Sequence, residues 1–260
     1  MRTLLALAVA VAFGTPFAAS AADAPAPKVL RLLVYDVTYT SKTTHEIKSS
    51  GLSSGYGGMT PSMGGQPSES TNPPSTTASA SQFVNADDHG RLTISVIAAT
   101  PDGGLVVDAS FDGAKNVQPT TRVAVYPDGR LSVDPAHPLV PEAARILPLI
   151  ARGFIAERDV STGSTWRVQA PAPAKGSTTY RVQSSDGKRA LIAIEGVVSM
   201  PGPTGFDEAD QGTTTYATDL VSPVAYELTA RIRRQLSMDQ SMTTNARITA
   251  TLVSDSFAPK

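Results

Sequence analysis

The sequence contains no cysteine and only three histidines in 260 residues. Without cysteine there can be no disulfide bond, thiolate zinc site, iron–sulfur cluster or cysteine nucleophile. Positive charge is not in excess either, since 22 Lys and Arg stand against 23 Asp and Glu, which argues against binding to a nucleic-acid backbone. Charged residues make up only 17% of the chain, and 20 Gly and 20 Pro interrupt it, which excludes a helical bundle or coiled coil. The composition predicts short strands joined by many turns.

The N-terminal residues have the order of a secretory signal peptide. An initial Met-Arg pair is followed by an apolar run over residues 4–13 and then by small residues. The apolar run is too short to cross a bilayer, which needs about 20 residues. No later stretch is long and apolar enough to do so. We therefore expect residues 1–22 to be removed, and residues 23–260 to be released as a secreted or periplasmic protein without a transmembrane segment.

Most of the remaining chain alternates apolar and polar residues, which is the pattern of antiparallel strands with one buried face. Turn sequences such as Asp-Gly separate several of these stretches. We expect roughly ten strands, at residues 29–48, 91–99, 105–111, 121–126, 131–133, 165–169, 178–184, 189–200, 213–220, 224–236 and 242–253. Both faces of the first strand are apolar near its start, around Leu30 and Leu32, so we expect that part to be covered on both sides.

One helix is expected, over residues 138–157. Pro141 suits the first helical position, Glu142 faces the positive end of the helix dipole, and apolar residues recur at helical spacing. Pro148 should kink the helix. A helix with one apolar face needs a sheet to cover it. The predicted fold is therefore a single mainly β domain, with an antiparallel curved sheet, half-barrel or sandwich packed on one kinked amphipathic helix.

Two stretches are expected to be loops. In residues 49–81, 24 of 33 residues are Gly, Pro, Ser or Thr, and such a segment buries too little apolar surface to offset its ordering entropy. We expect it to be a disordered insertion between two paired strands, which is tolerable because loop-closure cost grows slowly with length. Residues 200–212 are expected to form a second loop. Its carboxylates Asp207, Glu208 and Asp210 are interpreted as solvated charge, with a weak cation site as the alternative.

A small polar cluster offers one candidate for catalysis. If the first two strands pair, His45 at the end of the first could approach Asp87 and His89 in a turn at residues 85–90. Such a cluster could be the acid–base pair of a hydrolase of envelope material. The interpretation we favour is a polar hairpin end, with Asp and Gly present for turn geometry.

Other motifs are weaker. Residues 51–55 (GLSSG) match the nucleophile elbow of serine hydrolases, but they lie in a Ser/Gly-rich tract without a following helix. Asp108 and Glu195 could form a paired-carboxylate site only if the fold brought them together. Three arginines at 231, 233 and 234 are interpreted as the wet face of an edge or outer strand. No phosphate loop or dinucleotide fingerprint is present, and no cofactor or metal is expected.

The second group of strands begins at Gly163-Ser164-Thr165-Trp166. A signal peptide, antiparallel strands, one amphipathic helix and further hairpins starting at this motif together resemble bacterial secreted domains of unknown function. The layout is similar to the half-barrel of periplasmic lipoprotein carriers, in which a curved sheet wraps a helix and can enclose an apolar cavity. The resemblance implies no catalytic residue.

These observations lead to one expected function and two alternatives. We expect an exported, non-enzymatic binding or cell-envelope module that holds an apolar small molecule or envelope component between sheet and helix. The first candidates to line that site are Trp166, Ile146, Ile150 and Phe154. The alternatives are the envelope hydrolase described above and a purely structural domain that displays the tract at 49–81 as a mobile interaction element.

Overall fold

The structure is a computed structural model. The residues it describes are 28–48, 79–134, 136–137, 139–151, 154–155, 158–170, 172–202, 205–237 and 240–257. The predicted signal peptide, most of the predicted insertion at 49–81 and the GLSSG motif lie outside these residues.

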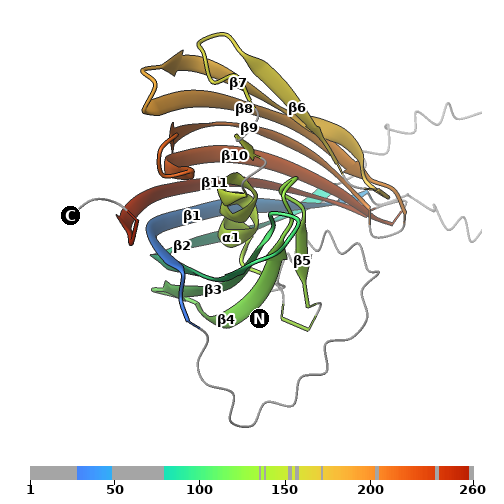
Figure 1. Cartoon of the computed structure of the whole chain (residues 1–260). Helices are drawn as coiled ribbons and strands as arrows, with labels where there is room; N and C mark the ends of the chain where they lie inside the picture. Colours follow the sequence, from blue (N-terminus) through green and yellow to red (C-terminus); the bar gives the residue numbers. More distant parts are fainter. Residues whose placement is uncertain are drawn as a thin grey trace, which may run out of the picture.

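In the described residues, eleven strands form one antiparallel sheet that does not close on itself (Figure 1). The strands are β1 (Arg31–Lys48), β2 (Ser79–Ala99), β3 (Leu105–Gly113), β4 (Val117–Val125), β5 (Leu131–Val133), β6 (Thr165–Gln169), β7 (Lys175–Ser185), β8 (Arg189–Met200), β9 (Phe206–Ala217), β10 (Ser222–Ser237) and β11 (Gln240–Asp255). Their order across the sheet is β5-β4-β3-β2-β1-β11-β10-β9-β8-β7-β6. The predicted mainly β fold is thus confirmed.

This strand order explains where the helix lies. Strands β1–β5 and β6–β11 each pair with their neighbours in sequence, and the two groups join where β1 pairs with β11. As a result β5 and β6, although consecutive, lie at opposite edges of the sheet. The chain must cross a face of the sheet to pass from one edge to the other, and the helix lies on that crossing (Figure 1).

The helical part of the crossing is shorter than predicted. The α-helix α1 covers Pro141–Ile146, and the 3-10 helix η1 covers Leu147–Ile150. We call these ten residues the helical segment. Pro141 begins it as predicted, but the expected continuous helix over 138–157 is wrong, because the α-helix gives way to a 3-10 turn next to Pro148, whose ring leaves no backbone N–H to donate.

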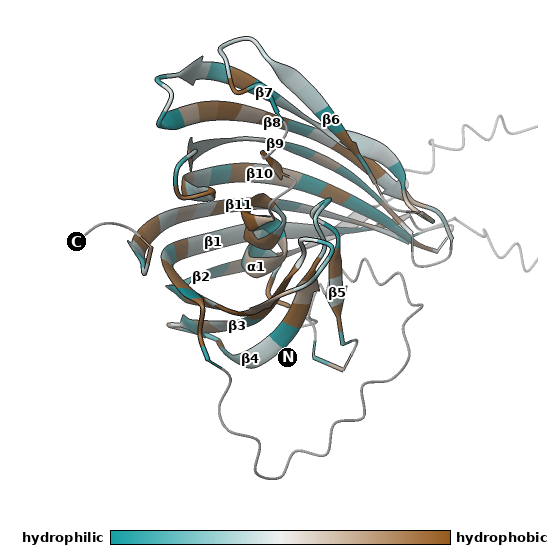
Figure 2. Ribbon diagram, in the orientation of Figure 1, coloured by the Kyte–Doolittle hydropathy of each residue, from teal (hydrophilic) through white to brown (hydrophobic). Residues whose placement is uncertain are grey.

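Side chains of each strand alternate between an inner face, toward the helical segment, and an outer face. The ribbons of several strands accordingly alternate between hydrophobic and hydrophilic residues (Figure 2). The inner face and the helical segment share one apolar core, which includes Leu33, Tyr35, Val37, Leu92, Ile94, Val107, Val123, Ile192, Tyr216, Tyr226, Leu228 and Ile248. The expectation that the start of the first strand is covered on both sides is wrong. Leu30 and Leu32 are 45% and 37% exposed, because no described element packs on the outer face there.

Two predicted loops are strand. The strand β2 starts at Ser79, within the predicted insertion, and continues through the predicted turn at 85–90, because it pairs with β1 along that strand's whole length. The strand β9 starts at Phe206, within the predicted loop at 200–212. In both cases the ladder of backbone hydrogen bonds to neighbouring strands outweighs the low strand propensity of Asp and Gly.

Candidate functional site

The four residues predicted to line a ligand site all lie in the core between the sheet and the helical segment. Ile146 and Ile150 come from the helical segment, Phe154 follows it, and Trp166 starts the edge strand β6. All four are buried and belong to the same core cluster. The structure therefore brings them together, and they pack against protein side chains. Their role toward a ligand stays a prediction.

An aromatic group occupies the core beside β6. The ring centroid of Phe154 lies 5.7 Å from that of Trp166, 5.0 Å from Tyr180 and 5.3 Å from Tyr216. Trp166 and Tyr180 are paired across β6 and β7, and their rings stack at 5.5 Å. Burial raises the pKa of Tyr180 to about 12, so its hydroxyl stays protonated at neutral pH and can donate a hydrogen bond. Sequence reasoning missed Tyr180 and Tyr216, although both alternate with polar residues in their strands.

One polar atom of this aromatic group lacks a partner. The indole Nε1 of Trp166 is buried, and no described residue accepts a hydrogen bond from it. A buried N–H without an acceptor is uncommon and costs free energy. The indole could instead donate to a polar atom of a bound molecule.

The side chain of Arg145 links the helical segment to β9 by ion pairs with two carboxylates. Its guanidinium donates to Asp210 at 2.7 Å and also pairs with Glu208. The side chains of Arg145, Glu208 and Asp210 are 21%, 4% and 7% exposed, so this ion cluster is largely removed from water. Burial raises the pKa of Asp210, and the positive charge of Arg145 opposes that rise.

The ion cluster corrects the interpretation of residues 200–212 as a loop with solvated carboxylates. Among the three acids only Asp207 is exposed. Glu208 and Asp210 lie two positions apart in a strand and therefore share its inner face. The sequence feature that could have predicted the ion cluster is this two-residue spacing of the acids, together with an arginine within the predicted amphipathic helix.

A second polar contact holds the helical segment. The hydroxyl of Tyr216 donates to the backbone carbonyl of Leu149 at 3.0 Å, and both groups are buried. Burial raises the pKa of Tyr216. The helical segment is therefore attached to β9 at two points by polar contacts, with apolar packing between them.

The predicted cluster of His45, Asp87 and His89 does not form. In the register of β1 and β2, His45 pairs with Gln82, whereas His89 pairs with Thr38. The two histidines are thus seven residues apart along the ladder, or about 23 Å at the usual rise of a strand. The premise of the prediction was a turn at 85–90, and that stretch is an extended strand. The geometry removes the support for a hydrolase built on these residues.

The other candidate pairs are also separated. Five strands lie between Asp108 on β3 and Glu195 on β8, and Asp108 accepts two hydrogen bonds from Arg122 instead. The arginines Arg231 and Arg233 are exposed on a wet face as predicted, but β10 lies inside the sheet and not at its edge. Arg234 lies over the ring of Phe206 at 5.6 Å.

Within the described part of the chain, no group of three or more His, Asp and Glu side chains could hold a metal ion. The described residues also contain no helix long and apolar enough to span a membrane.

No family model matches the sequence, and no curated protein matches it. A solved structure described as "Lipid-protein interactions in lipovitellin" is similar at 7% sequence identity, with a TM-score of 0.41. The match covers 90% of this chain and 26% of that chain, so this chain spans about a quarter of the other's length. A likeness at this level does not establish a shared fold or function.

Proposed function

We propose that the protein is an exported, non-enzymatic binding module that holds an apolar ligand between the sheet and the helical segment. One observation carries the proposal: an unclosed sheet has an apolar inner face, and in the described chain the helix on that face is only ten residues long. Export rests on the predicted signal peptide at residues 1–22.

The packing of the core restricts how a ligand would bind. Because Ile146, Ile150, Phe154 and Trp166 are buried against other side chains, an apolar molecule must take over contacts that the helical segment now makes. The segment's polar attachments are the ion cluster of Arg145 and the hydrogen bond of Tyr216. Displacing so short an element exposes less apolar surface than opening the sheet would.

The aromatic group suggests how the ligand would be oriented. The rings beside β6 offer flat apolar surfaces, and the buried indole N–H of Trp166 can donate to an acceptor on the ligand. This combination fits a hydrocarbon chain that carries a carbonyl or carboxyl group.

The single tryptophan makes the proposal testable by fluorescence. We expect the fluorescent fatty acid cis-parinaric acid to quench Trp166 emission in a saturable titration with about one site per chain. Phe154→Ala should weaken this binding, because Phe154 contacts Trp166 and Tyr180. The matched control is Val117→Ala, an exposed position on β4.

Native mass spectrometry of protein purified from its own envelope gives a second measurement. A mass that exceeds the chain by that of a lipid would support the proposal. A bare mass, together with no saturable quenching by cis-parinaric acid, would contradict it.

A further inference from the structure

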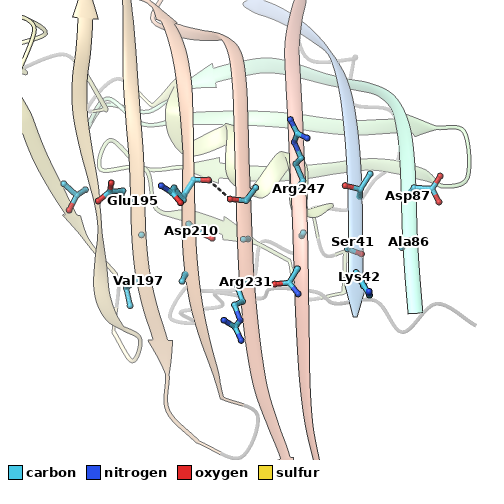
Figure 3. Close-up of a pocket in the computed structure, with 18 of the residues that line it drawn as sticks. Ser41, Lys42, Ala86, Asp87, Glu195, Val197, Asp210, Arg231 and Arg247 are labelled. Atoms are coloured by element: carbon cyan, nitrogen blue, oxygen red, sulfur yellow. Dashed lines mark hydrogen bonds between the residues drawn. The ribbon is translucent and has the colours of Figure 1, made fainter. Parts of the chain in front are cut away.

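The outer face of the sheet carries an open groove of about 1000 Å³ that sequence reasoning did not anticipate. Its side chains form a band across the strands, from β6 through β11 and β1 to β2 (Figure 3). The lining residues Thr229 and Arg231 alternate along β10 with residues of its buried inner face. The groove therefore lies on the face away from the helical segment, separate from the proposed apolar site.

The strand register explains why the groove is continuous. Glu195 on β8 pairs with Gln211 on β9, and Gln211 pairs with Thr229 on β10. The next row contains Arg231, which pairs with Asn245 on β11, and Asn245 pairs with Lys42 on β1. Each row places one outward side chain on each successive strand. Across eight strands the rows extend about 34 Å at the usual strand spacing.

The band contains many neutral hydrogen-bonding groups among its charged and small apolar residues. Thr40, Thr229, Gln211 and Asn245 supply hydroxyl and amide groups, and the residues that line the groove include no aromatic side chain. Hydroxyls and amides both donate and accept hydrogen bonds, so they suit a ligand rich in hydroxyl groups. Without aromatic side chains the groove has no platform on which nucleobases could stack.

The charge of the band is mildly positive. Its outward cations are Lys42, Arg167, Arg231 and Arg247, and its outward acids are Asp87 and Glu195. Four positive minus two negative charges leave a net charge of plus two. A third lining acid, Asp210, alternates to the inner face, where it pairs with the guanidinium of Arg145.

The positive charge is concentrated on three adjacent strands. Arg231 on β10, Arg247 on β11 and Lys42 on β1 lie in neighbouring register positions. Arg231 and Lys42 both pair with Asn245 on β11, one from each side. Their backbones are therefore two strands apart, or about 10 Å. Glu227 neutralises part of this charge through an ion pair with Arg247 at 2.7 Å.

We propose that this groove binds a segment of an acidic polysaccharide. An elongated chain with many hydroxyls and sparse carboxylates matches the length of the groove, its hydroxyl and amide groups, and its positive centre at Arg231, Arg247 and Lys42. A nucleic acid carries far more charge than a net of plus two would balance. The extended sugar chain lies across the strands, and its carboxylates approach the three central cations.

The experiment uses the full mature chain and sodium polygalacturonate, a polymer of uronic acid, as the probe. Affinity electrophoresis and isothermal titration would compare wild type with the double variant Arg231→Gln and Lys42→Gln. The matched control is Arg122→Gln, which removes one positive charge from an exposed arginine on β4, outside the groove. Urea unfolding midpoints of all variants would show that each is folded.

We expect polygalacturonate to retard the wild type and the control, and neutral dextran to retard neither. We expect the double variant to bind polygalacturonate at least tenfold more weakly. The proposal is overturned if the double variant binds like wild type, if dextran binds as well as polygalacturonate, or if single-stranded DNA binds more tightly than both. Binding of cis-parinaric acid should be the same in the double variant and wild type, so this test and that of the proposed apolar site can fail independently.

Discussion

Replacing Arg145 by methionine should destabilise the protein strongly, because it leaves two buried carboxylates without their counterion. Methionine keeps most of the aliphatic length of the side chain and removes the guanidinium, with its charge and its N–H donors. The side chains of Glu208 and Asp210 are only 4% and 7% exposed, and the variant would leave them without a positive charge from the helical segment. Breaking a buried ion pair by removing one partner costs about 3–5 kcal/mol.

The measurement is urea unfolding at pH 7 followed by the fluorescence of Trp166, which lies in the core beside the helical segment. With a urea slope of about 2–3 kcal/mol/M, a loss of this size lowers the midpoint by about 1–2.5 M. The matched control is Arg122→Met, which breaks the pair with Asp108, in which the arginine is 61% exposed. Such an exposed pair is worth at most about 1 kcal/mol.

The loss of stability in Arg145→Met should also depend on pH, and the pKa of Asp210 fixes the direction of this dependence. Burial raises the pKa of Asp210 above its usual 3.8, so between that value and the raised one the folded state binds more protons than the unfolded state. The free energy of unfolding therefore falls as pH rises through this window and recovers as pH falls. Losing Arg145 raises the pKa of Asp210 further, because Arg145 lowers it. The destabilisation by Arg145→Met should be largest at neutral pH and shrink on acidification.

A rescue variant completes the test. Adding Glu208→Gln and Asp210→Asn to Arg145→Met removes all three charges, and we expect it to recover most of the lost stability, since replacing a whole buried ion cluster by uncharged groups is often close to neutral. The reasoning is refuted if Arg145→Met costs no more than Arg122→Met, or if its cost is the same at pH 7 and at pH 5.

Three further substitutions test other contacts by urea unfolding. Tyr216→Phe should cost about 1–3 kcal/mol, because the buried carbonyl of Leu149 loses its donor, and an unchanged midpoint would show that this bond does not hold the helical segment. Gly212→Ala should cost about 1–3 kcal/mol, because the added Cβ would clash with the backbone oxygen of Glu227 on β10. An unchanged midpoint would mean that the two strands can move apart there. Arg31→Met should cost about 3 kcal/mol and speed amide exchange at the end of β11, because it leaves Asp255 buried without its guanidinium. An unchanged rate of amide exchange at the end of β11 would contradict a role for Arg31 in stabilising that end of the strand.

The local pattern predicted much of the fold correctly. In the predicted strand at residues 224–236, alternation predicts a buried face formed by Tyr226, Leu228, Ala230 and Ile232, and all four are buried in β10. The turn at residues 186–187 lies between β7 and β8 as predicted. These features depend on near neighbours in the chain, through the two-residue period of a strand and the conformations that turn residues allow. These features can therefore be predicted without knowing which strands pair with one another.

The errors at residues 85–90 and 200–212 share one physical cause. Asp88, Glu208 and Asp210 read as turn or loop residues because isolated carboxylates avoid the interior. In the structure Asp88 accepts hydrogen bonds from the backbone of Lys115 and from the side chain of Asn116, and Asp210 pairs with an arginine 65 positions away. Burial of a charge is decided by such distant partners, which local propensity does not contain.

By itself, then, the sequence determined the class of the fold, the hairpins and the inward side chains of most strands, because alternation and turn chemistry act over a few residues. Only the tertiary structure decided that β1 pairs with β11, that the chain crosses the inner face between opposite edges, and that outward side chains of eight strands align into one groove. Those features depend on register between strands far apart in sequence, and register is set by the packing of the whole inner face.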